Sequence, residues 1–252
     1  MAFAHLFALG AALSWTLASL FSHQAALRFG SLHFNRLRML AAAILLVIMT
    51  ALTGGNFAMP PAFWLPVFLS SIVGVVLGDY FLFVAMRRLG PRRTAILFAA
   101  NAPLAAILGL LFLDEILSGL QILAILVGFV GICFAIIYGK RRDLLHIWEA
   151  ITPPLWIGIA AGCLAAFGQA IGVLLLRPVM SAGGDPMFVG LVRVTIAGLI
   201  FWLTWPFDRR KSEHALMPDI KLSLLILANG FFGLSFGVFL LLKALETGNV
   251  AE

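Results

Sequence analysis

The chain has 252 residues, of which 62% are hydrophobic and only 11% are charged, and its mean hydropathy is +1.07. Soluble domains carry roughly 25% charged residues, so this chain has too few charges to cover a water-facing surface. The composition therefore excludes an ordinary soluble protein and predicts an integral membrane protein.

Eight apolar runs follow one another along the chain, and a helix needs roughly 20 such residues to cross a bilayer. Glycine, proline and charged residues separate the runs, as at Gly54-Gly55 with Pro60-Pro61. The runs lack the alternating polar pattern of barrel strands, and a helix satisfies its backbone hydrogen bonds within one segment. The predicted fold class is an all-α polytopic membrane protein with these spans: Phe3–Leu27, Phe34–Leu52, Leu65–Met86, Thr94–Leu113, Leu117–Tyr138, Leu155–Leu176, Met187–Trp205 and Leu222–Leu245.

The basic residues are distributed unevenly between the two sides of the predicted spans. The net charge is +6, yet of 17 Lys and Arg residues 14 flank the loops after the odd-numbered runs, and 3 flank those after the even-numbered runs or before the first. The positive-inside rule therefore places the basic side in the cytoplasm and the N-terminus outside, in a bacterial inner membrane. This topology explains the net charge, so no nucleic-acid partner is expected. The cytoplasmic set is Arg28, Arg36, Arg38, Arg87, Arg88, Arg92, Arg93, Lys140, Arg141, Arg142, Arg209, Arg210, Lys211 and Lys221.

The third and eighth runs share a pattern of small residues. Four positions of the third run recur in the eighth at a constant offset of 159. Small residues at such spacing let membrane helices approach closely, so they are predicted packing positions. The pairs are Gly74 with Gly233, Gly78 with Gly237, Leu82 with Leu241 and Ala85 with Ala244.

The second and seventh runs match as well, because Arg38 and Arg193 precede similar small-residue stretches at an offset of 155. A repeat unit of five helices is odd, so its second copy must enter the membrane from the opposite side, as in many secondary transporters. The expected organisation is a first repeat in residues 1–139, a basic cytoplasmic linker in 140–154 and an incomplete second repeat in 155–252. A ten-helix plan would then lack its last two helices, leaving about eight.

Four stretches carry a family resemblance: Gly78–Gly90, Asn101–Pro103, Leu113–Glu115 and Gly128–Gly131. Their order resembles the EamA family of the drug/metabolite transporter (DMT) superfamily. The resemblance implies a ten-helix permease, often an exporter of amino acids or other small metabolites. One departure is the uncharged loop at 54–64, where many relatives are basic, so the orientation is expected to be opposite to theirs.

Asp79 is the acid placed best inside a predicted span, about two turns from the cytoplasmic end of the third run. A charge within a span is costly and is by default a functional candidate. A secondary transporter needs an energy source, and a proton gradient with Asp79 as the proton carrier is the simplest one. The alternative is that Asp79 pairs with an arginine or a hydroxyl and only locks helices together.

Other polar groups within the spans are candidates for substrate binding or translocation, although each is also typical of bonds between helices. Pro103 predicts a helix break that frees the carbonyl of Ala99, and the nearby amide of Asn101 adds a polar group; the alternative is a kink satisfied internally. Arg38 and Arg193 are expected to extend towards the headgroups. The candidate set is Trp15, Asp79, Tyr80, Asn101, Gln169, Asn229 and Ser235.

No enzyme motif appears in the sequence. It contains no His-Glu-x-x-His, Gly-x-Ser-x-Gly or Walker-type loop, so we expect no catalytic residue, metal site or cofactor. Two classes of function remain. A secondary permease for small molecules is the preferred interpretation, and a non-transporting scaffold or assembly subunit, which the incomplete second repeat favours, is the alternative.

The charge distribution gives a testable topology. In a protein whose native cysteines Cys133 and Cys163 are replaced by serine, Ala2→Cys should react with an impermeant thiol reagent added outside the cell. Arg142→Cys should react only after permeabilisation, because the basic side is held in the cytoplasm. If intact cells were labelled only at position 142, the N-terminus would lie in the cytoplasm and the predicted orientation would be wrong.

Overall fold

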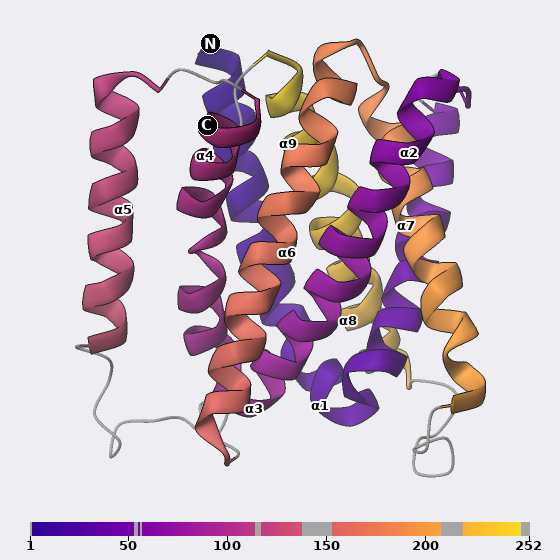
Figure 1. Ribbon diagram of the computed structural model, residues 1–252. Helices are drawn as coiled ribbons and strands as arrows, with labels where there is room; N and C mark the ends of the chain where they lie inside the picture. The colour runs from indigo at the N-terminus through magenta and orange to yellow at the C-terminus, as the bar shows by residue number, and fades with distance from the viewer. Residues whose placement is uncertain are drawn as a thin grey trace.

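The computed structural model describes residues 2–52, 55, 57–113, 117–137, 153–207 and 219–247. All regular structure in these residues is helical (Figure 1). The predicted all-α membrane architecture is therefore confirmed. Most of the predicted basic linker, together with Asp114 and Glu115, lies outside the described residues.

The first helix, α1 (Ala2–Leu52), is a hairpin of two spans. Its 51 residues would measure about 75 Å if straight, more than twice the thickness of the hydrocarbon core. Gly30 interrupts it with a φ of 74° and a ψ of 167°, a conformation that glycine adopts without a steric penalty. The chain turns there (Figure 1), so residues 2–29 form a first arm and residues 31–52 a second.

The next helical stretch is divided in the same way. It runs through α2 (Pro61–Ser70), the π-helical segment η1 (Ser71–Leu77), α3 (Gly78–Phe98) and α4 (Asn101–Phe112). Gly90 has a φ of 79° and a ψ of 166°, and Pro91 follows it. The third span therefore ends at Gly90, and the fourth returns from Pro91 through α4.

The rest of the described chain supplies single spans. Each of the two divided stretches crosses the bundle twice. Three further long apolar segments of the described chain and α5 each cross it once, so the total is eight traverses, which correspond to the eight predicted runs. The chain reverses between α6 and α7 at Gly183, whose φ is 84°. The remaining elements are α5 (Gly119–Ile137), α6 (Leu155–Ser181), α7 (Pro186–Leu203), η4 (Trp205–Phe207), α8 (Ile220–Asn229), the π-helical η5 (Gly230–Ser235) and α9 (Phe236–Thr247).

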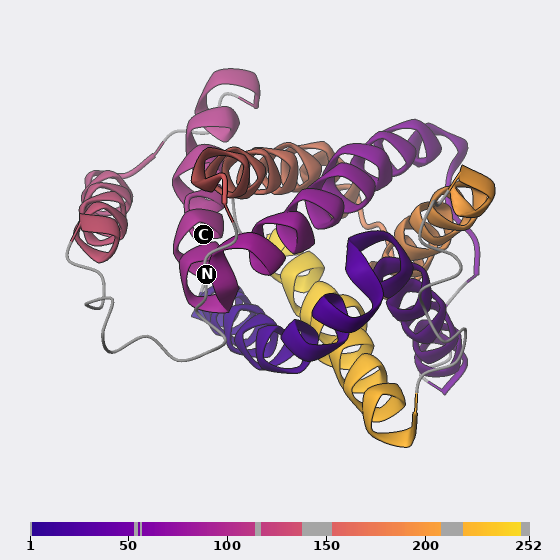
Figure 2. The same cartoon turned by 90° about the horizontal axis from the view of Figure 1, so that it is seen from below.

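The third span packs backbone to backbone against α6, which runs alongside it (Figures 1 and 2). A Cβ at Gly172 would lie only 2.8 Å from the Gly74 Cα, and one at Gly168 would lie 3.3 Å from the Gly78 Cα. Larger side chains at these positions would separate the two helices.

The eighth span, formed by α8, η5 and α9, makes a corresponding contact with the first arm of α1. A Cβ at Gly233 would lie 3.3 Å from the Ala18 Cβ, and one at Gly237 would lie 2.9 Å from the indole ring of Trp15. Each of these small residues therefore lies at a contact between distant parts of the chain. The other two predicted packing residues are also buried: Ala85 and Ala244.

The two π-helical segments lie at matching places in the sequence. η1 begins at Ser71 and η5 begins at Gly230, 159 residues later, which is the offset of the small-residue pattern. The reversals at Gly30 and Gly183 are separated by a similar distance, 153 residues. These correspondences support a repeat, while its inversion stays a prediction.

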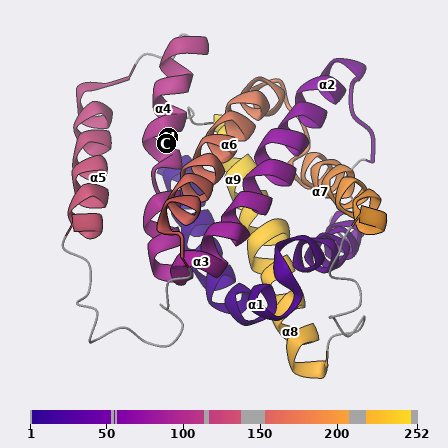
Figure 3. The same cartoon turned by 60° about the horizontal axis from the view of Figure 1, so that its bottom comes forward.

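The helices α4 and α5 lie towards one edge of the bundle (Figures 2 and 3). Large apolar side chains of α5 are exposed, among them Leu120, Leu123 and Val127. Lipid covers such side chains in a membrane. The interior instead lies among α1, α3, α6, α7 and the eighth span.

The glycine contacts predict the effect of adding one methyl group. Gly172→Ala should lower the free energy of unfolding in detergent by about 1–3 kcal/mol, because its Cβ overlaps the Gly74 backbone. Gly128→Ala on α5 is the matched control, since nothing lies within 4 Å of its Cβ position, and it should be neutral or stabilising by up to about 1 kcal/mol. Equal effects of the two substitutions would contradict the close packing.

Candidate functional site

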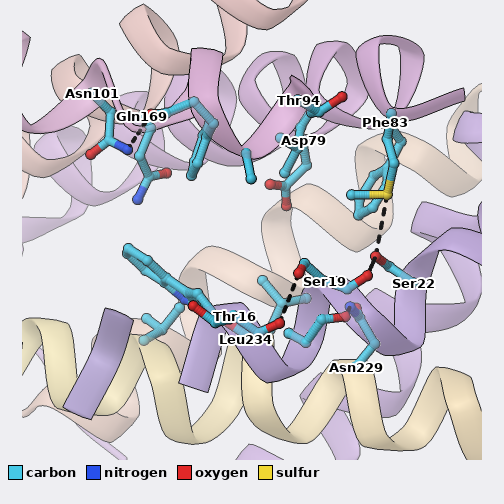
Figure 4. A pocket seen from close by; sticks show the side chains of 18 of the residues that line it. Thr16, Ser19, Ser22, Asp79, Phe83, Thr94, Asn101, Gln169, Asn229 and Leu234 are labelled. Carbon is cyan, nitrogen blue, oxygen red and sulfur yellow. Dashed lines mark hydrogen bonds between the residues drawn. The ribbon is translucent and has the colours of Figure 1, made fainter. Parts of the chain in front are cut away.

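A cavity of about 330 Å³ lies inside the bundle (Figure 4). The first arm of α1 forms one wall, and α3, α4 and α6 form another. The π-helical segments also reach it, through Gly74 on η1 and Gly233 on η5. π-Helical turns are rare and occur frequently at functional sites, so this cavity is the candidate functional site.

An ion pair forms part of the cavity lining. Arg38, on the second arm of α1, donates a hydrogen bond from Nη2 to Oδ2 of Asp79 at 2.6 Å. Both side chains are largely buried, with 5% and 14% of their surface exposed. The distance is typical of a strong charge-assisted hydrogen bond, and the pair joins the second span to the third.

Neighbouring groups hold the guanidinium of Arg38 in place. Nη1 donates to Oδ1 of Asn229 at 3.3 Å, and the ring of Phe83 lies 4.8 Å from Cζ. Asn229 in turn donates from Nδ2 to the carbonyl of Ala18 at 2.8 Å. Arg38 is therefore fixed from three sides, by the eighth span, an aromatic face and Asp79.

Arg193 on α7 brings a second guanidinium to the same cavity. It is only 2% exposed, and Nη2 lies against Gly74 and Gly172, within 3.5 Å of where a Cβ would stand on either. Arg193 interacts electrostatically with Asp79, but Nε is buried with no hydrogen-bond partner. Among the described residues the cavity lining thus has two positive charges and one negative charge.

The expectation that Arg38 and Arg193 extend to the headgroups was wrong. Both are buried and both line the cavity, because their helices turn them towards Asp79 and away from lipid. Hydropathy places a residue along a span but does not say which way its side chain faces. The signal that would have found them is their recurrence at the same place in the two predicted repeats.

Hydroxyl and indole groups of the first arm of α1 bind the eighth span. Ser14 donates from Oγ to the carbonyl of Phe232 at 2.7 Å, and Trp15 donates from Nε1 to the carbonyl of Gly233 at 2.9 Å. Both acceptors belong to η5, where π-helical geometry changes the usual backbone pairing. Trp15 therefore lines the cavity with its indole N–H already engaged.

The cavity brings together most of the predicted binding residues. Gln169 and Asn101 come from α6 and α4 (Figure 4), and Gln169 makes no hydrogen bond within the described part of the chain. Tyr80 instead packs against the apolar core beside Phe81. Ser235 bonds the carbonyls of Ala42 and Gly230. The cavity residues from the predicted set are Trp15, Asp79, Asn101, Gln169 and Asn229.

The helix break near Pro103 leaves no free carbonyl at Ala99. The helix is interrupted at Ala99 and Ala100, and the carbonyl of Ala99 accepts from the backbone N–H of Ala102 at 3.3 Å. Asn101 donates from Nδ2 to the carbonyl of Phe98 at 2.6 Å. The break is therefore satisfied internally, and the idea of a freed binding carbonyl there was wrong.

Sequence reasoning missed a row of hydroxyl groups on the first arm of α1. Thr16, Ser19 and Ser22 line the cavity, and each donates its proton to a carbonyl three or four residues earlier. Their oxygens can still accept hydrogen bonds. The signal in the sequence that could have identified them is their spacing of three residues, which places them on one helix face.

Comparisons with known proteins agree with this architecture. Residues 2–137 match the model of the EamA-like transporter family. A solved structure titled "Crystal structure of protein" superposes with a TM-score of 0.73 at 15% identity, covering 98% of this chain and 80% of that one. At this identity the likeness shows the fold alone. No protein of curated function matches the sequence.

The buried ion pair should show strong coupling in a double-mutant cycle. We expect Arg38→Gln and Asp79→Asn to couple by more than about 1 kcal/mol in the free energy of unfolding, because each leaves a buried charge without its partner. The control is the pair of Lys243 and Glu246, whose N–O distance of 2.7 Å is close to the 2.6 Å of the buried pair but whose side chains are more exposed. Its coupling should stay below about 0.5 kcal/mol. Equal coupling in the two cycles would show that the Arg38–Asp79 contact is energetically ordinary.

Proposed function

The chain belongs to the EamA-like transporter family, within the DMT superfamily, and we propose that it is a secondary exporter of small metabolites such as amino acids or drug-like compounds. The observation that carries this proposal is the cavity with a paired, largely buried carboxylate in its lining. We further propose that a proton gradient drives transport and that Asp79 carries the proton.

The size and lining of the cavity support a small-molecule substrate. Ligand sites typically measure about 300–1,000 Å³ and combine apolar walls with a few polar groups, and this cavity falls within that range at about 330 Å³. Phe83, Met86 and Phe98 offer apolar contact, while the hydroxyls of the first arm of α1 offer polar contact. Figure 4 shows Thr16 and Ser19 across the cavity from Asp79.

The packing of the predicted repeats supports alternating access. The third span contacts α6, the first helix of the second repeat, and the eighth span contacts the first arm of α1. Each predicted repeat thus places its third helix against the first helix of the other. Rocking of two such halves around a site between them is a general mechanism of secondary transporters.

Asp79 is the acid that the described cavity lining contains. Binding of a proton would remove its negative charge and weaken the hydrogen bond from Arg38. Because this bond joins the second span to the third, protonation would alter a contact between helices as well as the charge of the cavity. A hydrogen-bond donor of the substrate would compete with the proton for the same carboxylate, which couples their movements in opposite directions.

We also propose that the N-terminus lies outside the cell. The support is the 14-to-3 distribution of basic residues in the sequence. In this orientation the reversals at Gly30 and Gly90 face the cytoplasm, where the proton carried by Asp79 would be released.

The proposed function predicts a specific defect for Asp79→Asn. A metabolite-tolerance screen in cells lacking or overproducing the protein first identifies an exported compound. In liposomes containing the purified protein, Asp79→Asn should abolish accumulation of that compound against its gradient. Downhill exchange should remain, because the cavity is retained and only the titrating group is lost.

The matched control is Glu246→Gln, which neutralises an acid outside the cavity and should leave uphill transport unchanged. Equal loss of uphill transport and exchange in folded Asp79→Asn would make this residue structural. Undiminished uphill transport by that variant would remove it from the mechanism, and no exported compound in the screen would argue against transport itself.

A further inference from the structure

We infer that Arg193 forms a subsite for a carboxylate group of the substrate, so that this transporter handles small organic molecules that carry a carboxylate. The inference rests on the proposed transport function and adds the chemical class of the ligand. It is based on the charges of the side chains that line the cavity and on the hydrogen bonds that they make.

The two guanidinium groups of the cavity differ in their partners. Arg38 has a carboxylate at 2.6 Å and an amide oxygen at 3.3 Å. Arg193 is equally buried, yet it makes no hydrogen bond within the described residues, whereas Arg38 bonds through both of its Nη atoms. Nε has no hydrogen-bond partner in either arginine. Asp79 is already committed to Arg38, so one positive charge in the cavity lining lacks a bonded counterion.

A buried charge without a bonded partner is strongly unfavourable, and the local packing keeps Arg193 where it is. Nη2 lies in a space that exists because Gly74 and Gly172 have no side chains, as a Cβ at these positions would come within 3.1 Å and 3.5 Å of it. A guanidinium presents several N–H donors in one plane and binds carboxylates in a bidentate manner. A carboxylate of the substrate is therefore the partner that fits.

The surroundings of Arg193 suit the remainder of such a ligand. Gln169 lies one turn before Gly172 on α6 and lines the cavity with an amide that has no hydrogen bond among the described residues. It can donate a second bond to the carboxylate. The aromatic rings of Phe83 and Phe98 line the same cavity and can cover an apolar body.

The test compares acids with their amides, which differ in charge but little in shape. Three pairs serve as probes with the full-length protein in detergent at constant ionic strength: acetate and acetamide, benzoate and benzamide, 3-phenylpropionate and 3-phenylpropionamide. We expect at least one acid to raise the melting temperature saturably, with an apparent affinity at least tenfold above that of its amide. Stabilisation by none of the acids, or equally by acids and amides, would overturn the inference.

Substitutions identify the subsite. Arg193→Gln should weaken acid binding about tenfold or more, since it removes a charged hydrogen-bond donor, and Arg193→Lys should be intermediate because it keeps the charge and loses the planar fork. Lys243→Gln removes a positive charge outside the cavity lining and should change nothing. Asp79→Asn should tighten acid binding, because it removes the negative charge near the subsite.

If Arg193 were purely structural, its substitution would change the stability of the protein, but acid binding would not weaken in Arg193→Gln and tighten in Asp79→Asn. If Arg193→Gln fails to fold, Arg193→Lys and Asp79→Asn still decide the question, and unchanged acid affinity in both would overturn the subsite. The metabolite screen separates the two proposals. Export of compounds that all lack a carboxylate would refute the subsite and leave the transport function intact, whereas acid binding without any exported compound would support the subsite and refute transport.

Discussion

Two guanidinium groups and one carboxylate meet in a cavity inside a membrane protein, and much of the structure serves to hold them there. Charges are costly in such surroundings unless they are paired, so the helices around Asp79 must supply partners. Arg38 reaches it from the second span, Asn229 fixes Arg38 from the eighth, and the face of Phe83 covers the guanidinium. The ion pair thus connects spans that are far apart in the sequence.

Glycine provides the space that this arrangement needs. The third span and α6 approach until Gly74 and Gly172 meet, and the guanidinium of Arg193 lies against that contact. The π-helical segments η1 and η5 lie at matching places in the sequence, and Gly74 belongs to η1. In η5 two backbone carbonyls accept hydrogen bonds from Ser14 and Trp15. Backbone geometry, close packing and the location of charge are therefore aspects of one site.

The sequence was a good guide to the spans and a partial guide to the site. The apolar runs predicted the helical membrane fold because lipid constrains every span in the same local way. The reversals at Gly30 and Gly90 fall in the gaps between predicted runs, after Leu27 and after Met86. The direction of Arg193 did not follow, because it depends on contacts with Gly74 and Gly172, which come from other helices. Asn229, a predicted binding residue, lies in the cavity lining, but its role in holding Arg38 could not be seen without the packing.

The cavity is asymmetric even though the predicted repeat is not. Arg38 and Arg193 occupy corresponding positions, 155 residues apart, and both are present. The position that corresponds to Asp79, 159 residues later, is Val238, which also lines the cavity. A fully symmetric lining would carry two acids for its two arginines and would be neutral. Because valine stands at the second of these positions, the lining has a single carboxylate and two guanidinium groups. The same departure from symmetry gives the cavity its excess of positive charge and leaves Arg193 without a bonded acid among the described residues.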